Sequence, residues 1–349
     1  MRQKIYIGTV EEINFYFWGD IDASLSPLSA YASLLLGIPT MYSKQILSFL
    51  NGFEINLLDC KKIFAKCRPE RKQIFISALM LEFLWLSIYV NYNLSKVATS
   101  RDNIEIQRDV FLSTDVIEAT LRCKEIAQGY VKPWPFNYLP LPKLDYNILK
   151  DQPSDFASEI SLYCLHFIIL HELAHWFMYT YGDGRYEQEA LSEIIADEFA
   201  LSHSLDKESF CQSTFLLVFK KRMLAIIEVC SMFVFIDQIR YRNHSTHPSG
   251  ICRLRNILDS SKETYIEFKR NGYVLEDTEL VFESIYQHAS FTLYFYSQKI
   301  FGKHCNEVKT MRDKLLGQSY DTPKVLFNHL IDLYREADRN RMRVVRLHD

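Results

Sequence analysis

The residues best suited to chemistry lie near the middle of the chain, in the run His171-Glu172-Leu173-Ala174-His175. Two histidines four positions apart share one face of an α-helix, where both imidazoles can reach one metal ion, and zinc is the natural candidate. Glu172 follows the first histidine, so its carboxylate is placed to take a proton from a water bound to that metal. Apolar residues flank the run on both sides, and ionisable groups in such a helix are costly to bury unless something pairs them. The pattern therefore predicts a zinc hydrolase.

A catalytic zinc ion needs a third protein ligand, and the spacing to that ligand differs between kinds of enzyme. The pattern HExxHxxGxxH is absent, because positions 178 and 181 are Met178 and Tyr181. Glu193 comes eighteen residues after His175, and Asp197 lies four residues further on, on the same face of the next expected helix. We expect Glu193 to bind the metal and Asp197 to accept a hydrogen bond from the second ring nitrogen of a ligand histidine.

Glu189 is an alternative third ligand, one helical turn earlier on the same face. With Glu189 as the ligand, the carboxylate four positions on would be Glu193, and Asp197 would be left without a role. We therefore prefer Glu193. Apolar residues surround Glu193 and Asp197, which argues against a merely solvated acidic face.

The sequence HELAH followed by SEIIADEFA at residues 192–200 resembles the gluzincin metallopeptidases, in which HExxH and a later ExxxD form the zinc site. Residues 246–253, THPSGICR, are similar to the HP…R segment of HtpX-like and CAAX-processing endopeptidases. By that resemblance His247 is the oxyanion donor and Arg253 its supporting cation, and both side chains suit a developing negative charge. The alternative for His247 and Pro248 is a simple helix start, since proline is common at the first helical position.

The order of the parts is similar to that of the Lit-type phage-exclusion peptidases, which cleave a host translation factor when a phage protein triggers them. The helix EIIADEFA also resembles the ImmA/IrrE peptidases, although their aliphatic-Met-Pro ending is absent here. These resemblances cover roughly residues 155–260. They imply an intracellular zinc endopeptidase that acts on a specific protein, in phage exclusion or stress defence, with a phage- or host-derived protein as a possible activator.

Helices have to position these residues, because the chain has only 11 Gly and 10 Pro among 349 residues and shows long stretches with a 3.6-residue period. We expect a mainly α (α+β) fold, with a zincin-like helical core and a small strand element. The clearest strand text is at residues 4–18, where β-branched and aromatic residues dominate, and the arginine-rich end is a further candidate. Later helices are expected at about 154–181, 186–204, 208–242, 248–271, 275–300 and 322–338.

Four prolines between residues 132 and 142 forbid a helix there and place a domain boundary near residues 130–150. We expect residues 1–145 to form a helical N-terminal region with an initial strand segment, which regulates the enzyme or recognises its substrate. Residues 146–349 are expected to form the zincin-like metallopeptidase domain with a helical tail. The proline-rich segment is either a linker or an extended edge on which a peptide can lie.

The composition excludes several classes of protein. A hydrophobic share of 48% and a charged share of 24% are those of a globular chain, and a net charge of −3 lacks the basic excess of a nucleic-acid binder. Eight cysteines without CxxC spacing, and an opening unlike a signal peptide, indicate a cytoplasmic protein with reduced thiols. The apolar runs 75–90 and 223–236 are short and interrupted by Glu82 and Glu228, so we expect core helices rather than membrane spans.

A rival function is a zinc-binding switch or sensor, or a pseudo-protease without hydrolytic activity. A structural zinc site is closed by a fourth protein ligand, whereas a catalytic site keeps one position open. No fourth ligand is evident in the sequence, which favours a peptidase acting on a protein or peptide substrate.

Overall fold

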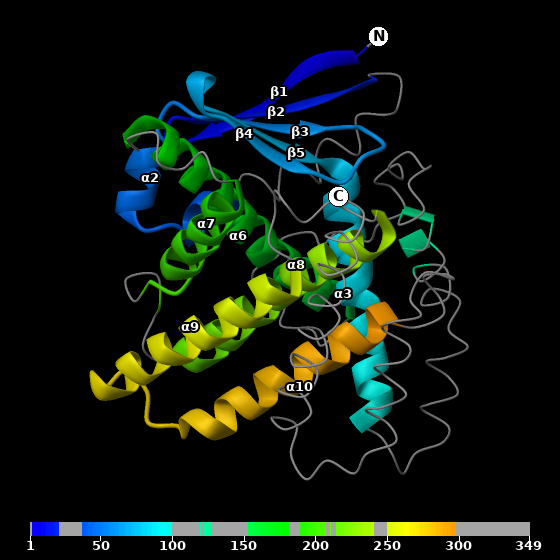
Figure 1. Ribbon diagram of the computed structural model, residues 1–349. Helices are drawn as coiled ribbons and strands as arrows, with labels where there is room; N and C mark the ends of the chain where they lie inside the picture. The colour runs from blue at the N-terminus through cyan, green and yellow to red at the C-terminus, as the bar shows by residue number, and fades with distance from the viewer. Residues whose placement is uncertain are drawn as a thin grey trace, which may run out of the picture.

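The computed structural model describes residues 2–20, 37–99, 119, 122, 123, 125, 126, 153–181, 189–206, 210, 214–240 and 250–297. In this part of the chain, one five-stranded sheet lies across the ends of a set of helices (Figure 1). The expected mainly α (α+β) fold is therefore confirmed.

The sheet is built from residues near the N-terminus. Its strands are β1 (Arg2–Val10), β2 (Ile13–Asp20), β3 (Glu54–Leu58), β4 (Ala65–Arg68) and β5 (Gln73–Ser77), in the spatial order β1-β2-β3-β5-β4. β1 and β2 form an antiparallel hairpin, while β2, β3 and β5 run parallel to one another. β4 pairs antiparallel with β5 and is one of the two edge strands of the sheet formed by the described residues, the other being β1.

The remaining elements are helical. They are η1 (Ile38–Met41), α2 (Lys44–Leu50), η2 (Pro69–Arg71), α3 (Ala78–Thr99), α6 (Pro153–Tyr181), α7 (Glu189–Ser204), α8 (Phe215–Arg240), α9 (Gly250–Arg270) and α10 (Thr278–Ser297). α6 lies at the centre, packed against α3, α7 and α8 and against the edge strand β4. Trp85 of α3 donates a buried hydrogen bond of 2.8 Å to Ser158 of α6, which ties these two core helices together.

Burial explains the apolar character of these helices. Of the described helices, only the segment Phe156–Tyr181 of α6 is long and apolar enough to cross a membrane, and 83% of its most apolar window is buried inside the protein. It therefore packs as a core helix. Glu82 and Glu228, which interrupt the other apolar runs, are each 1% exposed and meet polar partners in the core, as buried charges must.

Several expectations about the elements are confirmed and others need correction. Residues 4–18 are β-structure, as predicted, and the helices expected between 154 and 300 are present with ends shifted by a few residues. The strands β3, β4 and β5 were not predicted, and residues 75–77, expected to begin a helix, complete β5 instead. The proline-rich segment, the boundary at 130–150, the helix at 322–338 and the arginine-rich end lie outside the described residues, so the division into 1–145 and 146–349 stays a prediction.

Candidate metal centre

Two helices bring the three predicted metal ligands together. His171 and His175 lie on α6, and Glu193 lies near the start of α7. The Nε2 atom of His171 lies 3.3 Å from Nε2 of His175 and 3.3 Å from Oε2 of Glu193. Nε2 of His175 lies 3.5 Å from Oε1 of Glu193. All three side chains thus aim one ligand atom at a common point.

These separations fit a tetrahedral zinc ion. Ligand atoms at zinc distances of 2.0–2.1 Å in a tetrahedron are about 3.3 Å apart. The separations found here are close to that value, with each histidine nearest to a different oxygen of Glu193. The donor set of two imidazoles and one carboxylate is one that catalytic zinc sites use. Within the described part of the chain, the cluster has three members.

Asp197 contacts the ring nitrogen of His171 that does not face the metal cluster. Its Oδ1 lies 3.0 Å from Nδ1 of His171, so Nδ1 can donate to the carboxylate and leave the Nε2 lone pair facing the cluster. Arg253 of α9 then donates to both oxygens of Asp197, at 2.7 Å each. A further nitrogen of the same guanidinium lies 3.4 Å from Glu193. Arg253 therefore contacts both carboxylates that follow the HExxH run.

Charge pairing has a larger effect than burial on the pKa values of Asp197 and His171. Burial works against the ionised carboxyl of Asp197, but Arg253 and His171 hold its pKa below the ordinary value. Burial likewise works against the charged form of His171, but its hydrogen bonds to Asp197 and Glu193 raise its pKa to about 9. In the ion-free protein the carboxylates thus favour a positive charge where the bound metal would supply one.

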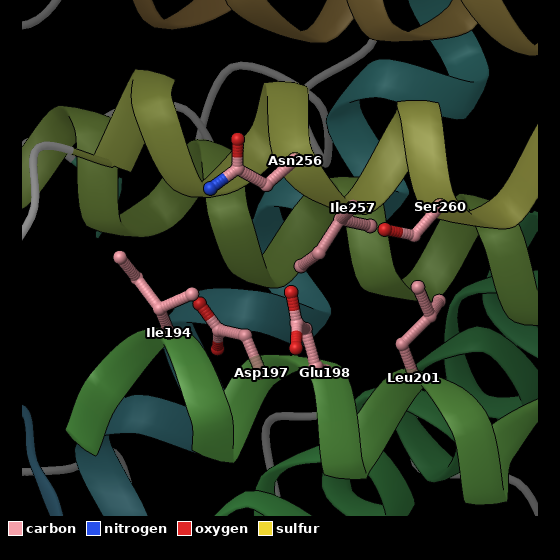
Figure 2. A pocket seen from close by; sticks show the side chains of 7 residues that line it. All are labelled: Ile194, Asp197, Glu198, Leu201, Asn256, Ile257 and Ser260. Carbon is pink, nitrogen blue, oxygen red and sulfur yellow. The ribbon is translucent and has the colours of Figure 1, made fainter. Parts of the chain in front are cut away.

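The helices α7 and α9 are closely packed beside Asp197. In Figure 2, Asp197 and Glu198 project from α7 toward α9, and Ile257 projects back from α9. The hollow between them measures about 10 Å³, which is room for one water molecule at most. This side of Asp197 offers no space for a substrate.

Glu172 is placed between the metal ligands and the sheet. It is 6% exposed, and burial raises the pKa of its carboxyl group, as a general base near neutral pH requires. The backbone N–H of Cys67 in β4 donates a hydrogen bond to this carboxylate. Sequence reasoning missed Cys67, because the contact uses a backbone group that any residue type would provide.

The outer edge of β4 lies beside Glu172. The Ser77 N–H donates to the carbonyl of Phe64, so Phe64 and every second residue of β4 direct their backbone groups toward β5. Ala65 and Cys67 alternate with them and direct their backbone groups away from β5, toward the outer edge. The edge strand therefore brings main-chain donors and acceptors to the carboxylate of the HExxH run.

The other predicted residues are placed less fully. His247 lies outside the described residues, and so does the side chain of Glu189, whose backbone begins α7. His166 on α6 is 1% exposed and packs against the ring of Tyr42. His203 packs against Phe199, its neighbour one turn back on α7.

Comparison with known families decides the class of protein. The family model for Peptidase U49 matches residues 74–266, which is more than half of the chain and includes both the HExxH run and Arg253. The chain belongs to the peptidase U49 family. No curated protein and no solved structure matches it. As a U49 peptidase it acts on a protein or peptide substrate, and the three-ligand cluster, Glu172 and Asp197 all fall within the matched region.

Proposed function

We propose that this U49 peptidase is a cytoplasmic zinc-dependent endopeptidase that hydrolyses a peptide bond in a specific protein. The observation that carries the proposal is the spacing of 3.3–3.5 Å among the ligand atoms of His171, His175 and Glu193, with the buried Glu172 beside them. When bound, zinc would supply a Lewis acid that polarises the scissile carbonyl and acidifies water. Asp197 would fix the tautomer and orientation of His171.

Glu172 is the general base in this mechanism. Its carboxylate takes a proton from the attacking water and passes that proton to the nitrogen of the leaving amine. The Cys67 N–H holds the carboxylate in one orientation, and burial keeps its pKa raised. Burial favours the protonated carboxyl and the Cys67 hydrogen bond favours the ionised carboxylate, so the two effects act in opposite directions on this pKa.

The outer edge of β4 is the place where the substrate backbone would lie. An extended peptide can add to a sheet edge through main-chain hydrogen bonds, and the outward N–H and C=O of Ala65 and the outward C=O of Cys67 would serve such pairing. A peptide in this position passes next to Glu172, because Cys67 is already bonded to that carboxylate. Main-chain pairing holds the scissile bond in an extended form, and side-chain pockets would select the sequence.

The family resemblance assigned Arg253 and His247 to one task, stabilising the oxyanion, and we now assign them to different tasks. The guanidinium of Arg253 is engaged by Asp197 and Glu193, so we assign it to holding these two carboxylates in place. His247, six residues earlier in the chain, remains the proposed donor to the oxyanion of the tetrahedral intermediate.

The resemblance to Lit-type peptidases supports a role in phage exclusion or stress defence, with a phage- or host-derived activator. A peptidase in the cytoplasm needs restraint, so we expect a latent state that an activator relieves. The family match supports proteolysis, and the three-ligand cluster supports a catalytic rather than a closed structural metal site.

Mapping of new protein N-termini in cells tests this function. Cells would express the wild-type chain or Glu172→Gln, with and without phage infection, and zinc would be measured on both purified proteins. We expect equal zinc content and a loss of cleavage of about 10²- to 10⁴-fold in the variant. Glu198→Gln is the matched control, because Glu198 is an exposed glutamate on α7 and should leave cleavage unchanged. Equal cleavage by wild type and Glu172→Gln would refute the mechanism.

A further inference from the structure

A second cavity lies in the helical core, between α3, α6, α8 and α10. Its volume is about 230 Å³, and its walls include Ile160 of α6 and Leu224 of α8. Ile160 precedes the metal ligand His171 by eleven residues, which is about 16 Å along the helix. The cavity is therefore separate from the metal centre, although α6 contributes residues to both.

The lining of this cavity includes polar groups, with a buried carboxylate and a buried amide oxygen among them. The Glu228 carboxylate is 1% exposed, accepts from Asn91 Nδ2 and Thr292 Oγ1 at 3.1 Å each, and lies 3.3 Å from Nε2 of His288. The Oδ1 atom of Asn91 is buried and has no hydrogen-bond partner within the described part of the protein. A buried acceptor without a donor costs free energy. A ligand that donates a hydrogen bond to this oxygen would therefore be favoured here.

The other walls are apolar. The rings of Tyr92 and Phe156 stack with centroids 4.3 Å apart, and Ile160 and Leu224 continue this surface. An apolar cavity of about 150 Å³ in a protein is enough to bind benzene. The cavity here is larger, so it has room for a six-membered ring with a short polar arm.

We propose that this cavity binds a small organic ammonium ion with an apolar body of about the size of one ring. The ammonium group has three donors, which suit the Glu228 carboxylate and the unpartnered Oδ1 of Asn91. The apolar body contacts Phe156, Ile160 and Leu224. A buried carboxylate binds a cation more strongly than a neutral donor of the same shape, which sets the selectivity of the site. This site is independent of the proposed zinc-dependent mechanism.

Binding of two matched probes to the full-length protein tests the inference. 2-Phenylethylamine carries the ammonium group, and 2-phenylethanol has the same size without the charge. Isothermal titration calorimetry and saturation-transfer NMR should show that the wild-type protein binds the amine at least tenfold more tightly than the alcohol. A lysine side chain of a polypeptide carries the same ammonium group. The third probe is therefore Nα-acetyl-lysine amide, whose ε-amine is free.

Variants of residues that line the cavity test where the amine binds. Leu224→Trp fills the cavity and should abolish binding of the amine, whereas Leu217→Trp, the same change at an exposed position of α8, should leave it intact. Glu228→Gln keeps an acceptor for Asn91 but removes the charge, so it should reduce the preference for the amine to less than twofold. Ile160→Phe is a second filling variant in case Leu224→Trp does not fold, and circular dichroism checks each protein.

Three outcomes would overturn the proposal. The first is no binding of 2-phenylethylamine to the wild-type protein at millimolar concentration, which would make the cavity a water-filled space. The second is equal binding of the amine to wild type and to a folded filling variant. The third is tighter binding of the lysine probe than of 2-phenylethylamine, which would assign the site to a polypeptide side chain instead.

Discussion

Arg253 and His171 are connected through the two oxygens of Asp197. The guanidinium donates to both oxygens at 2.7 Å, and one of them lies 3.0 Å from Nδ1 of His171. A cation on α9 therefore orients a histidine on α6 through a carboxylate on α7. The geometry of the metal centre therefore depends on all three of these helices.

Loss of the Asp197 charge should weaken metal binding. In Asp197→Asn the side chain keeps its size but no longer polarises His171, so we expect zinc affinity to fall by about 10- to 100-fold. Competition with a chromophoric chelator at fixed pH measures the change. The control is Glu198→Gln on the same helix, which is exposed and should bind zinc as wild type does. An Asp197→Asn affinity within twofold of wild type would show that this carboxylate does not support the ligand.

Removal of Arg253 should destabilise the whole protein. In Arg253→Met the buried Asp197 loses its partner, and such a loss costs about 3–5 kcal/mol of unfolding free energy. Urea denaturation of the ion-free protein measures it. Lys262→Met, which breaks the more exposed pair with Glu279, should cost less than about 1 kcal/mol.

A double-variant cycle extends that experiment. If Arg253 acts through Asp197, the costs of Arg253→Met and Asp197→Asn should sum to more than the cost of the double variant, because the two residues share one interaction. Strictly additive costs would mean that the two side chains contribute independently.

The outer edge of β4 can be tested with proline. Ala65→Pro removes an N–H that points away from β5, so the sheet keeps its ladder while a paired substrate loses one main-chain bond. We expect kcat/KM for a peptide substrate to fall at least tenfold, mainly through KM, with little change in the urea midpoint. Lys66→Pro is the contrasting variant, because it removes a bond to β5 and should lower stability itself. Unchanged kcat/KM in a folded Ala65→Pro variant would place the substrate elsewhere.

The pH dependence of stability should contain a contribution from His166. Burial, with a smaller effect of Arg222, holds the pKa of this imidazole well below its usual value, so the folded protein keeps it neutral while the unfolded chain protonates it below about pH 6.5. The folded pKa is lowered, so stability is present above pH 6.5 and is lost as the pH falls. Between pH 7.5 and 5.5, His166 should cost up to about 1.4 kcal/mol, and His166→Phe should lose correspondingly less stability than wild type. The measurement is the free energy of unfolding in urea as a function of pH. An equal pH dependence in wild type and His166→Phe would contradict this prediction.

The site was more predictable than the sheet. Helix geometry pairs His171 with His175 and Glu193 with Asp197, the need for a third ligand and the gluzincin resemblance joined the two pairs, and the structure brings these side chains together. The short strands carried a weaker signal, because a continuous apolar run across residues 75–90 reads equally well as strand or as buried helix. Ser77 marks the change: its hydroxyl accepts from the N–H of Met80 and caps α3.

Other features could not be read from residue types. The donor to Glu172 is the backbone N–H of Cys67, and a backbone group leaves no signature in the sequence. Arg253 was identified through a resemblance that assigned it to the oxyanion, but its observed partners are two carboxylates, which depend on how α7 and α9 pack. Long-range packing of this kind is decided by the tertiary fold.

The contact between Cys67 and Glu172 also bears on how the enzyme is made. It joins positions 105 residues apart in the chain, and Arg253 reaches Asp197 from 56 residues further on. Contacts between residues so far apart in the sequence form late in folding, since a long loop must close, at a cost in entropy, before the contact can stabilise the protein. A chain still emerging from the ribosome before residue 253 has left the exit tunnel carries the HExxH helix without this cation. Assembly of the site therefore waits until Arg253 has left the ribosome, after the HExxH helix.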